Sequence, residues 1–280
     1  AVERLQRWFE SLVDTFSGND IPNLLQVLAN PETQEQGGRA LNQILADAES
    51  WVDGNFAPSV GSRALELLAS NRGADRHNGE RLLDLVQGTT GEQALGRVLA
   101  SMENAQLTQV IQYMDNQANA AQMGQLRTLL SSDDEAQRDI GNSIINQLAS
   151  PHESVRSDGN SLATMLTQPE HAGLARSLAT MFDVEQRRQL LQIFNNPQTR
   201  DATEMLLSAL QSSNRQERRS AADLLESFAS PVASEQANAA RMVQMLANPE
   251  QRHFAATILR SLPEELRPAA IAMRADAATR

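Results

Sequence analysis

Large apolar residues along this chain recur three and four residues apart, which is the spacing of one face of an α-helix. They gather in runs that each end in leucine or phenylalanine before a short polar turn. The ends of these runs lie 18 residues apart in two series, Leu130, Leu148 and Leu166, then Leu210, Phe228 and Leu246. This interval suits one helix of about 14 residues and a turn. Two such helices form a hairpin of about 36 residues, within the range of helical-repeat proteins.

The turns between the runs carry a recurrent pair, asparagine or serine followed by proline. The pairs are Asn30-Pro31, Ser150-Pro151, Asn196-Pro197, Ser230-Pro231 and Asn248-Pro249, with Gln168-Pro169 as a variant. The side-chain oxygen of Asn or Ser can accept a backbone N–H at a helix start, and proline as the first helical residue loses no hydrogen bond. We therefore predict that each pair begins a helix, with Gln168 as the weakest cap.

The pattern before this array also predicts helices. They cover residues 2–16, 21–28, 30–51, 60–68, 75–86, 92–102 and 105–114. Gly37-Gly38 predicts a break or a close helix contact within 30–51, and Thr90 with Gln93 resembles a capping box. The polar stretch 116–121 is a candidate seam. We predict N-terminal capping helices over residues 1–56 and a helical repeat array over 57–280, as one continuous array.

Two segments of the array resemble a known class of repeat. The residues 129–137 (LLSSDDEAQ) followed by 144–150 (IINQLAS), and again 209–228, look like armadillo and HEAT repeats. The resemblance implies an all-α fold, a right-handed α-solenoid of HEAT/armadillo-like helical hairpins with a concave binding face. It implies no particular partner and no catalytic residue, since the motifs encode helix packing.

Composition narrows the classes of function. The chain carries a formal net charge of −11, which argues against a general nucleic-acid surface because phosphate contacts dominate such binding. No run of about 18 apolar residues occurs, so we expect no membrane-spanning helix. Cysteine is absent, which excludes disulfides and thiolate metal sites and leaves the compartment undecided. We expect the cytoplasm, with delivery into a host cell as an alternative.

All 24 basic residues of this chain are arginine, so it contains no lysine. One explanation is a mutational bias toward arginine codons, and another is engineering. A third is selection against lysine as the attachment point for ubiquitin. The third would suit a bacterial protein that acts inside a eukaryotic cell.

Residues with catalytic or ligand chemistry are scattered. His77, His152, His171 and His253 show no metal-ligand spacing, although His152 and His171 occupy similar places in adjacent repeats. Residues 133–135 (DDE) are explained by a helix N-terminus, which favours acids. We therefore expect no cofactor, no metal and no catalytic residue.

The arginines that lie closest together in the sequence are the candidates for partner binding. They are Arg187, Arg188, Arg215, Arg218 and Arg219. Guanidinium groups can form paired contacts with carboxylates or phosphates, although Arg219 can also pair with Asp223 four residues later.

These observations favour a non-enzymatic scaffold that binds a partner protein or peptide along its concave face. Its acids would select basic partners. Two alternatives remain: a bacterial effector module that acts on a eukaryotic host protein, and a HEAT-like DNA-repair glycosylase. The glycosylase needs a basic groove, and the acidic balance counts against it.

Overall fold

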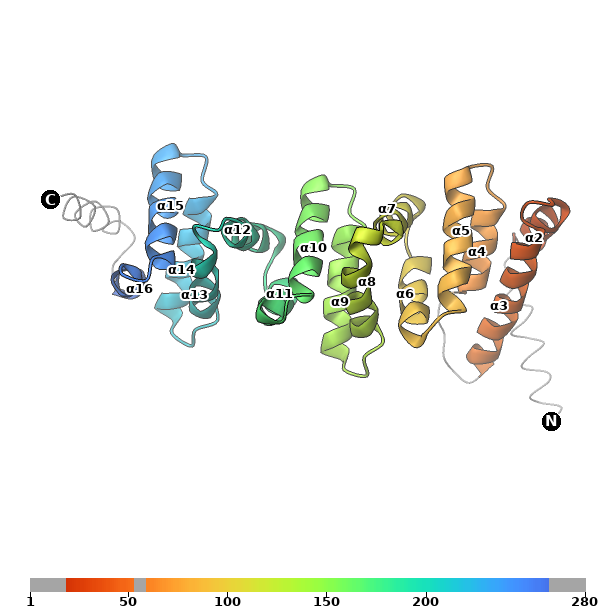
Figure 1. Ribbon diagram of the computed structural model, residues 1–280, viewed down its shortest axis with the longest axis horizontal. Coiled ribbons are helices and arrows are strands. Elements are labelled where there is room, and N and C mark those ends of the chain that lie inside the picture. Colours follow the sequence, from red (N-terminus) through yellow and green to blue (C-terminus); the bar gives the residue numbers. More distant parts are fainter. Residues whose placement is uncertain (1–18, 53–58, 262–280) are drawn as a thin grey trace. The chain divides into compact units, whose positions relative to one another are not determined.

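The computed structural model describes residues 19–52 and 59–261, and all the regular structure in these residues is helical (Figure 1). The first nine elements are α2 (Asp20–Ala29), α3 (Gln34–Val52), α4 (Val60–Leu68), α5 (Gly73–Val86), α6 (Thr90–Ala100), α7 (Asn104–Asp115), the 3₁₀ helix η1 (Gln117–Asn119), α8 (Ala120–Leu130) and α9 (Glu135–Leu148). The others are α10 (Glu153–Leu166), α11 (Pro169–Met181), α12 (Val184–Asn195), α13 (Arg200–Leu210), α14 (Arg215–Phe228), α15 (Ala233–Ala247) and α16 (Arg252–Ser261). The all-α prediction is therefore confirmed for this part of the chain.

Contacts between Cα atoms divide the chain into two compact units, unit 1 (residues 1–176) and unit 2 (residues 177–280). The stretch 116–121, predicted as a candidate seam, lies inside unit 1. The predicted boundary at residue 56, the predicted helix over 2–16 and the chain beyond Pro263 fall outside the described residues. Within residues 19–52 and 59–261, none of the helices combines the length and hydrophobicity that a bilayer span requires.

Helices in each unit pack mainly on their nearest neighbours along the chain. In unit 1, helices that are next but one to each other touch in two series: α2, α4, α6, α8 and α10, and α3, α5, α7 and α9. In unit 2 the corresponding series are α12, α14 and α16, and α13 with α15. Consecutive helices join the two series, so each unit has two layers of helices. This packing between neighbours is compatible with a helical repeat.

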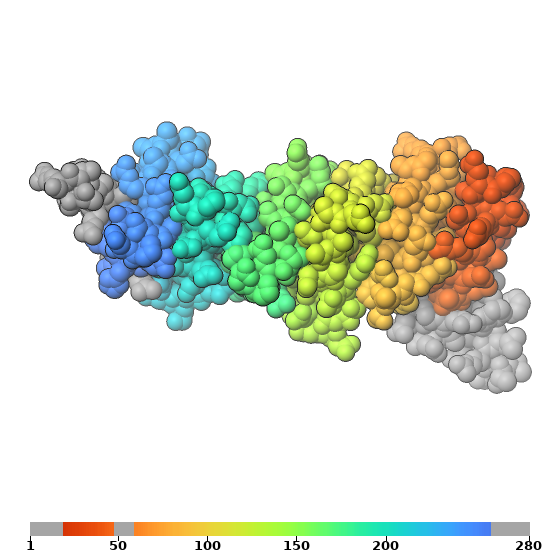
Figure 2. Space-filling model, viewed as in Figure 1, coloured from red at the N-terminus to blue at the C-terminus, as the bar shows by residue number. Residues whose placement is uncertain are grey.

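The core of each unit lies between these layers and consists of the periodic apolar residues. Leu148 and Leu246, which end two of the predicted runs, are 3% and 1% exposed. Small residues let the helices approach closely: a Cβ atom on Gly37 would lie 2.9 Å from Cγ1 of Val27. Helix α3 continues through Gly37 and Gly38 without interruption, so the predicted close contact is confirmed and the predicted break is wrong. Within each unit, side chains fill the space between successive helices on the face drawn in Figure 2.

The serine–proline and asparagine–proline pairs act differently from the prediction. The Ser150 hydroxyl accepts a hydrogen bond from the backbone N–H of His152, and His152 is the N-cap of α10. Likewise the side-chain oxygen of Asn196 accepts from the N–H of Gln198. These are side-chain turns that end one helix, and the next helix begins three or four residues after the serine or asparagine. Among the prolines of these pairs in the described residues, only Pro169 is the first residue of a helix as predicted.

The predicted capping box at α6 is displaced by one residue. The Thr89 hydroxyl accepts the N–H of Glu92, and the Glu92 carboxylate accepts the N–H of Thr89. The prediction had assigned Thr90 and Gln93 to these roles. Both pairs have the right spacing, and the helix start decides between them, since the N-cap residue must have non-helical backbone angles. Thr89 has such angles, with φ −67° and ψ 165°.

Candidate functional site

The five arginines predicted to bind a partner lie on two helices of unit 2. Arg187 and Arg188 are on α12, and Arg215, Arg218 and Arg219 are on α14. The structure separates them by what their guanidinium groups contact.

Two of the five bind the backbone of a neighbouring turn. Arg187 donates from Nε to the carbonyl of Leu178 at 2.8 Å and from Nη2 to the carbonyl of Phe182 at 2.9 Å. Arg218 donates to the carbonyl of Ser212. These carbonyls lie in the last turn of a helix or just beyond it, where no helical N–H reaches them. A role in holding these turns accounts for both side chains.

The other three arginines differ in whether they form ion pairs or hydrogen bonds within the protein. Nη1 of Arg188 lies 3.7 Å from the Glu185 carboxylate. Arg215 and Arg219 are exposed, and neither forms a hydrogen bond or ion pair with a described residue, Asp223 included. Since they are four residues apart on α14, they share one face of that helix. Arg215 and Arg219 are thus the two predicted residues with donors open to a partner.

Arg218 belongs to a repeated arrangement that the sequence interpretation missed. Each of these side chains donates to the carbonyl of the residue six positions earlier: Arg76, Arg138, Arg156, Arg200, Arg218 and Arg252. Four of the accepting carbonyls belong to turn serines: Ser70, Ser132, Ser150 and Ser212. The sequence signal was an arginine six residues after each of these serines.

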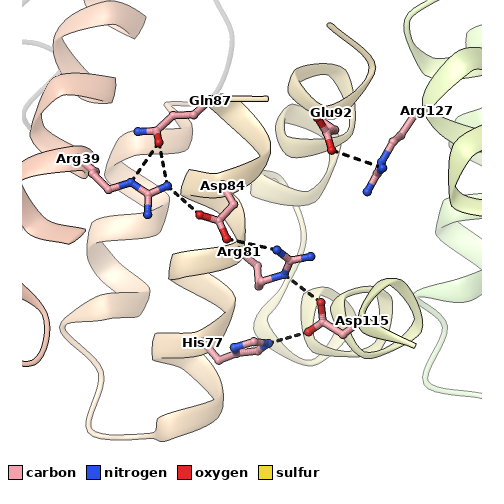
Figure 3. Close-up of polar contacts among 8 residues, drawn as sticks. All are labelled: Arg39, His77, Arg81, Asp84, Gln87, Glu92, Asp115 and Arg127. Carbon is pink, nitrogen blue, oxygen red and sulfur yellow. Dashed lines mark hydrogen bonds and ion pairs between the residues drawn. The ribbon is translucent and has the colours of Figure 1, made fainter. Parts of the chain in front are cut away.

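Unit 1 contains a polar network that crosses three helices of one layer (Figure 3). Arg39 on α3 donates from Nη2 to Asp84 on α5 at 2.8 Å, and its Nε and Nη2 lie 3.1 and 2.9 Å from the side-chain oxygen of Gln87. Arg81 Nη1 is 3.2 Å from the other oxygen of Asp84. One carboxylate therefore joins arginines from two neighbouring helices.

The network continues from α5 to the end of α7 (Figure 3). Arg81 Nε donates to one Asp115 oxygen at 2.9 Å, and His77 Nε2 lies 2.7 Å from the other. His77 lies on helix α5, within the helix predicted over residues 75–86, and its side chain is exposed. Asp84 and Asp115 are both engaged with basic side chains within the network. This arrangement connects successive helices of the layer and offers no free catalytic acid.

A second cross-helix pair lies between α6 and α8. Nη1 of Arg127 is 3.4 Å from Glu92, the residue that also closes the capping box of α6 (Figure 3). The hydrogen bond from the Thr89 backbone lowers the pKa of Glu92, with smaller contributions from the Thr89 hydroxyl and the Arg127 charge, against an opposing effect of burial. Glu92 therefore stays ionised where it supports the start of α6.

Tyr113 is the tyrosine of the chain and lies on α7. Its hydroxyl donates to the side-chain oxygen of Asn160 on α10 at 2.9 Å, and burial raises the pKa of Tyr113 to about 12. The phenol is therefore neutral near pH 7 and acts as a hydrogen-bonding contact between helices.

The histidines and the acidic run contribute no cluster of ligands. No group of three or more His, Asp or Glu side chains suited to a metal ion occurs among residues 19–52 and 59–261. Asp134 is the N-cap of α9, with its carboxylate accepting the N–H of Ala136 at 3.0 Å. The interpretation of residues 133–135 as a helix start is confirmed.

Unit 2 has an open hollow on its surface. It has a volume of about 470 Å³. Its lining residues are Glu204, Leu207, Ser208, Gln211, Ser212 and Glu217. Glu204, Leu207 and Ser208 of α13 and its C-cap Gln211 follow the spacing i, i+3, i+4, i+7 and thus lie on one face at the end of that helix. The sequence interpretation did not find this hollow, because its residues are ordinary helix-surface types.

Charge and apolar surface meet at this hollow. Glu204 is exposed and forms no hydrogen bond or ion pair with a described residue, whereas the Glu217 carboxylate accepts the Ser212 hydroxyl at 2.7 Å. The Gln211 amide contacts the sulfur of Met181 at 3.4 Å, and Met181 is 58% exposed. The hollow thus presents carboxylates next to an exposed apolar side chain.

Comparison of the chain with protein-family models, with curated proteins and with solved structures found no significant match. The assignment of a function therefore rests on the geometry of the two units.

Proposed function

We propose that this protein is a non-enzymatic interaction scaffold, built as a right-handed HEAT/armadillo-like α-solenoid, that binds a partner protein or peptide. Packing between neighbouring helices in two layers supports the solenoid, as do the repeated turns with their arginine six residues after the serine. In such proteins each repeat contacts its neighbours and leaves a long surface for a ligand.

The observation that carries the proposal is the hollow on α13. Its volume of about 470 Å³ would hold one large side chain, and it is open rather than enclosed. A site of this kind suits an anchoring residue that projects from a partner.

The lining residues of the hollow favour an arginine or lysine side chain of the partner as the anchoring residue. The Glu204 carboxylate is available to a guanidinium or ammonium group. Leu207 in the lining, and Met181 where it contacts Gln211 beside the hollow, offer apolar contacts for the stem of a long side chain. The formal net charge of −11 would add long-range attraction for a basic partner. Arg215 and Arg219 on α14 would contact an acidic group of the same partner.

We expect the variant Glu204→Gln to bind an arginine-containing peptide about fivefold more weakly than the parent chain, since an exposed ion pair contributes about 1 kcal/mol. Fluorescence anisotropy with a labelled peptide measures this affinity. A peptide with citrulline in place of arginine keeps the shape without the charge, and we expect it to bind the two proteins equally.

The matched control is Glu226→Gln, which removes an exposed carboxylate on α14 that is not part of the hollow. An equal loss of affinity in both variants would mean that net charge alone attracts the peptide, and the proposed site would be wrong. Failure to discriminate arginine from citrulline would also contradict it.

The absence of lysine favours a second candidate function, an effector module that acts on a protein of a eukaryotic host. Arg72 and Arg97 are exposed, and neither side chain forms a hydrogen bond or ion pair with a described residue. Replacing both by lysine preserves the charge and supplies sites for ubiquitin. We expect the double variant to have a several-fold shorter half-life in eukaryotic cytosol, as measured by pulse-chase labelling, and proteasome inhibition to restore it. An unchanged half-life would remove the basis of this candidate.

A further inference from the structure

Two exposed apolar side chains of unit 2 flank one connection between helices. Among the described residues of this unit, the exposed large apolar side chains are Met181, Val184 and Val232, at 58%, 50% and 49%. Met181 ends α11 and Val184 begins α12, so only two residues separate them. Single exposed apolar residues are common on proteins, whereas two at one connection offer a partner a larger apolar contact.

Met181 joins this connection to the hollow on α13. Its sulfur lies 3.4 Å from Nε2 of Gln211, and Gln211 lines the hollow at the C-terminal end of α13. Glu204, also in the lining, lies seven residues earlier, which is about 10 Å along the helix axis. The face of α13 therefore runs from an exposed carboxylate to an exposed apolar side chain.

We propose that the partner of the hollow is an amphipathic helix that places an arginine beside Glu204 and a large apolar residue on Met181. This inference rests on the proposed function, which supplies the arginine, and it adds the apolar contact and the conformation of the partner. Residues i and i+7 of a helix share one face and lie about 10 Å apart. A helix alongside α13 therefore presents two side chains at the required separation.

A helix suits this surface better than an extended peptide does. The described residues of unit 2 form only helices, so they provide no strand edge with which an extended peptide could form backbone hydrogen bonds. A helix satisfies its own backbone groups and binds through side chains alone. The flexible thioether of Met181 can also adapt to apolar residues of different shapes.

Charge favours a basic helix over a second copy of this chain. The side chain of Glu185, which follows Val184, is 63% exposed, and Glu204 is exposed at the other end of the surface. Basic residues beside the apolar contact of the partner would meet these carboxylates. A second copy would bring its own net charge of −11, and like net charges oppose association.

Three labelled, alanine-rich helical peptides test the separation of the two contacts. The first has a single arginine at its centre. The second adds leucines seven residues before and after the arginine, which covers both directions of binding, and the third moves them to five residues, on a different face. By fluorescence anisotropy with the full chain, we expect the second peptide to bind about tenfold more tightly than the first and the third less than about twofold more tightly.

Met181→Gln should reduce the gain from leucine to about twofold or less, and it should change the affinity for the first peptide less than about twofold. The matched control is Val232→Gln, which also removes an exposed apolar side chain. Val232 follows the C-terminal end of α14, whereas Ser212 and Glu217 of the hollow lie at its N-terminal end, about 20 Å away along the helix. We expect this control to leave all three affinities unchanged.

The other outcomes separate this inference from the proposed function. Equal affinities of the two leucine peptides, or equal effects of Met181→Gln and Val232→Gln, would overturn the apolar contact and leave the arginine site in place. If Glu204→Gln did not weaken binding of the first peptide, both proposals would be overturned. A gain from leucine that disappears as the chain dimerises at high concentration would identify a second copy as the occupant and overturn the inference. Far-UV circular dichroism of each variant confirms that it is folded.

Discussion

Replacing Gly61 by alanine is expected to destabilise unit 1 by about 3 kcal/mol, at the upper end of the range for overpacked interiors. Gly61 lies on α4 against the backbone of α3. An added Cβ would lie 2.5 Å from the backbone nitrogen of Ile44 and 2.9 Å from the carbonyl oxygen of Ala40. Because these are backbone atoms of a packed helix, α3 and α4 must move apart to make room. Chemical denaturation followed by circular dichroism measures the loss.

Gly38→Ala is the matched control, because a Cβ atom at Gly38 meets nothing within 4 Å. It lies inside α3, where alanine is favoured over glycine, so we expect a gain of about 0.5 to 1 kcal/mol. Opposite signs for the two substitutions would show that close helix packing, and not helix propensity, governs Gly61. A loss at Gly61 no larger than 0.5 kcal/mol, within the range of ordinary surface changes, would contradict the packing of α4 on α3.

Replacing Arg187 by alanine is expected to destabilise unit 2 by about 2 kcal/mol, because hydrogen bonds to a charged group contribute about 1.5 to 3 kcal/mol. The variant leaves the carbonyls of Leu178 and Phe182 without the guanidinium donors that reach them. Arg187→Lys should recover only part of the loss, since an ammonium group cannot reproduce the planar fork of a guanidinium. Hydrogen exchange at the amides of α12 reports the change locally.

Arg219→Ala is the control, since Arg219 is exposed and contacts no described residue through a hydrogen bond or ion pair. We expect its effect on stability to lie within about 0.5 kcal/mol. If Arg187→Ala left stability unchanged and abolished partner binding, Arg187 would be a binding residue as the sequence first suggested, and the assignment to the turn would be wrong.

The repeated turn, in which an arginine donates to the carbonyl of a serine six residues earlier, was not predicted from the sequence. The interval between Ser132 and Ser150 and the interval between Arg138 and Arg156 are the same 18 residues. Of these residues only Ser150 was predicted to have a role, as an N-cap, and in the structure both serine hydroxyls accept the N–H of the N-cap residue two positions later. The error arose because a serine two residues before an N-cap and a serine at the N-cap itself both accept a backbone N–H through the hydroxyl oxygen.

The sequence by itself determined that this protein is all-α and that its helical runs recur at a fixed interval. Apolar spacing and turn residues act between near neighbours in the chain, so they predicted helices such as α4 at residues 60–68 and the interval that separates the runs.

Contacts between distant residues were decided only by the tertiary structure. Arg39 meets Asp84 across 45 positions, and Gln211 meets Met181 across 30. The rotation of each helix about its axis selects which surface residues meet, and this rotation is set by packing against helices that the local pattern does not specify. The hollow on α13 and the division of the chain near residue 176 follow from the same packing.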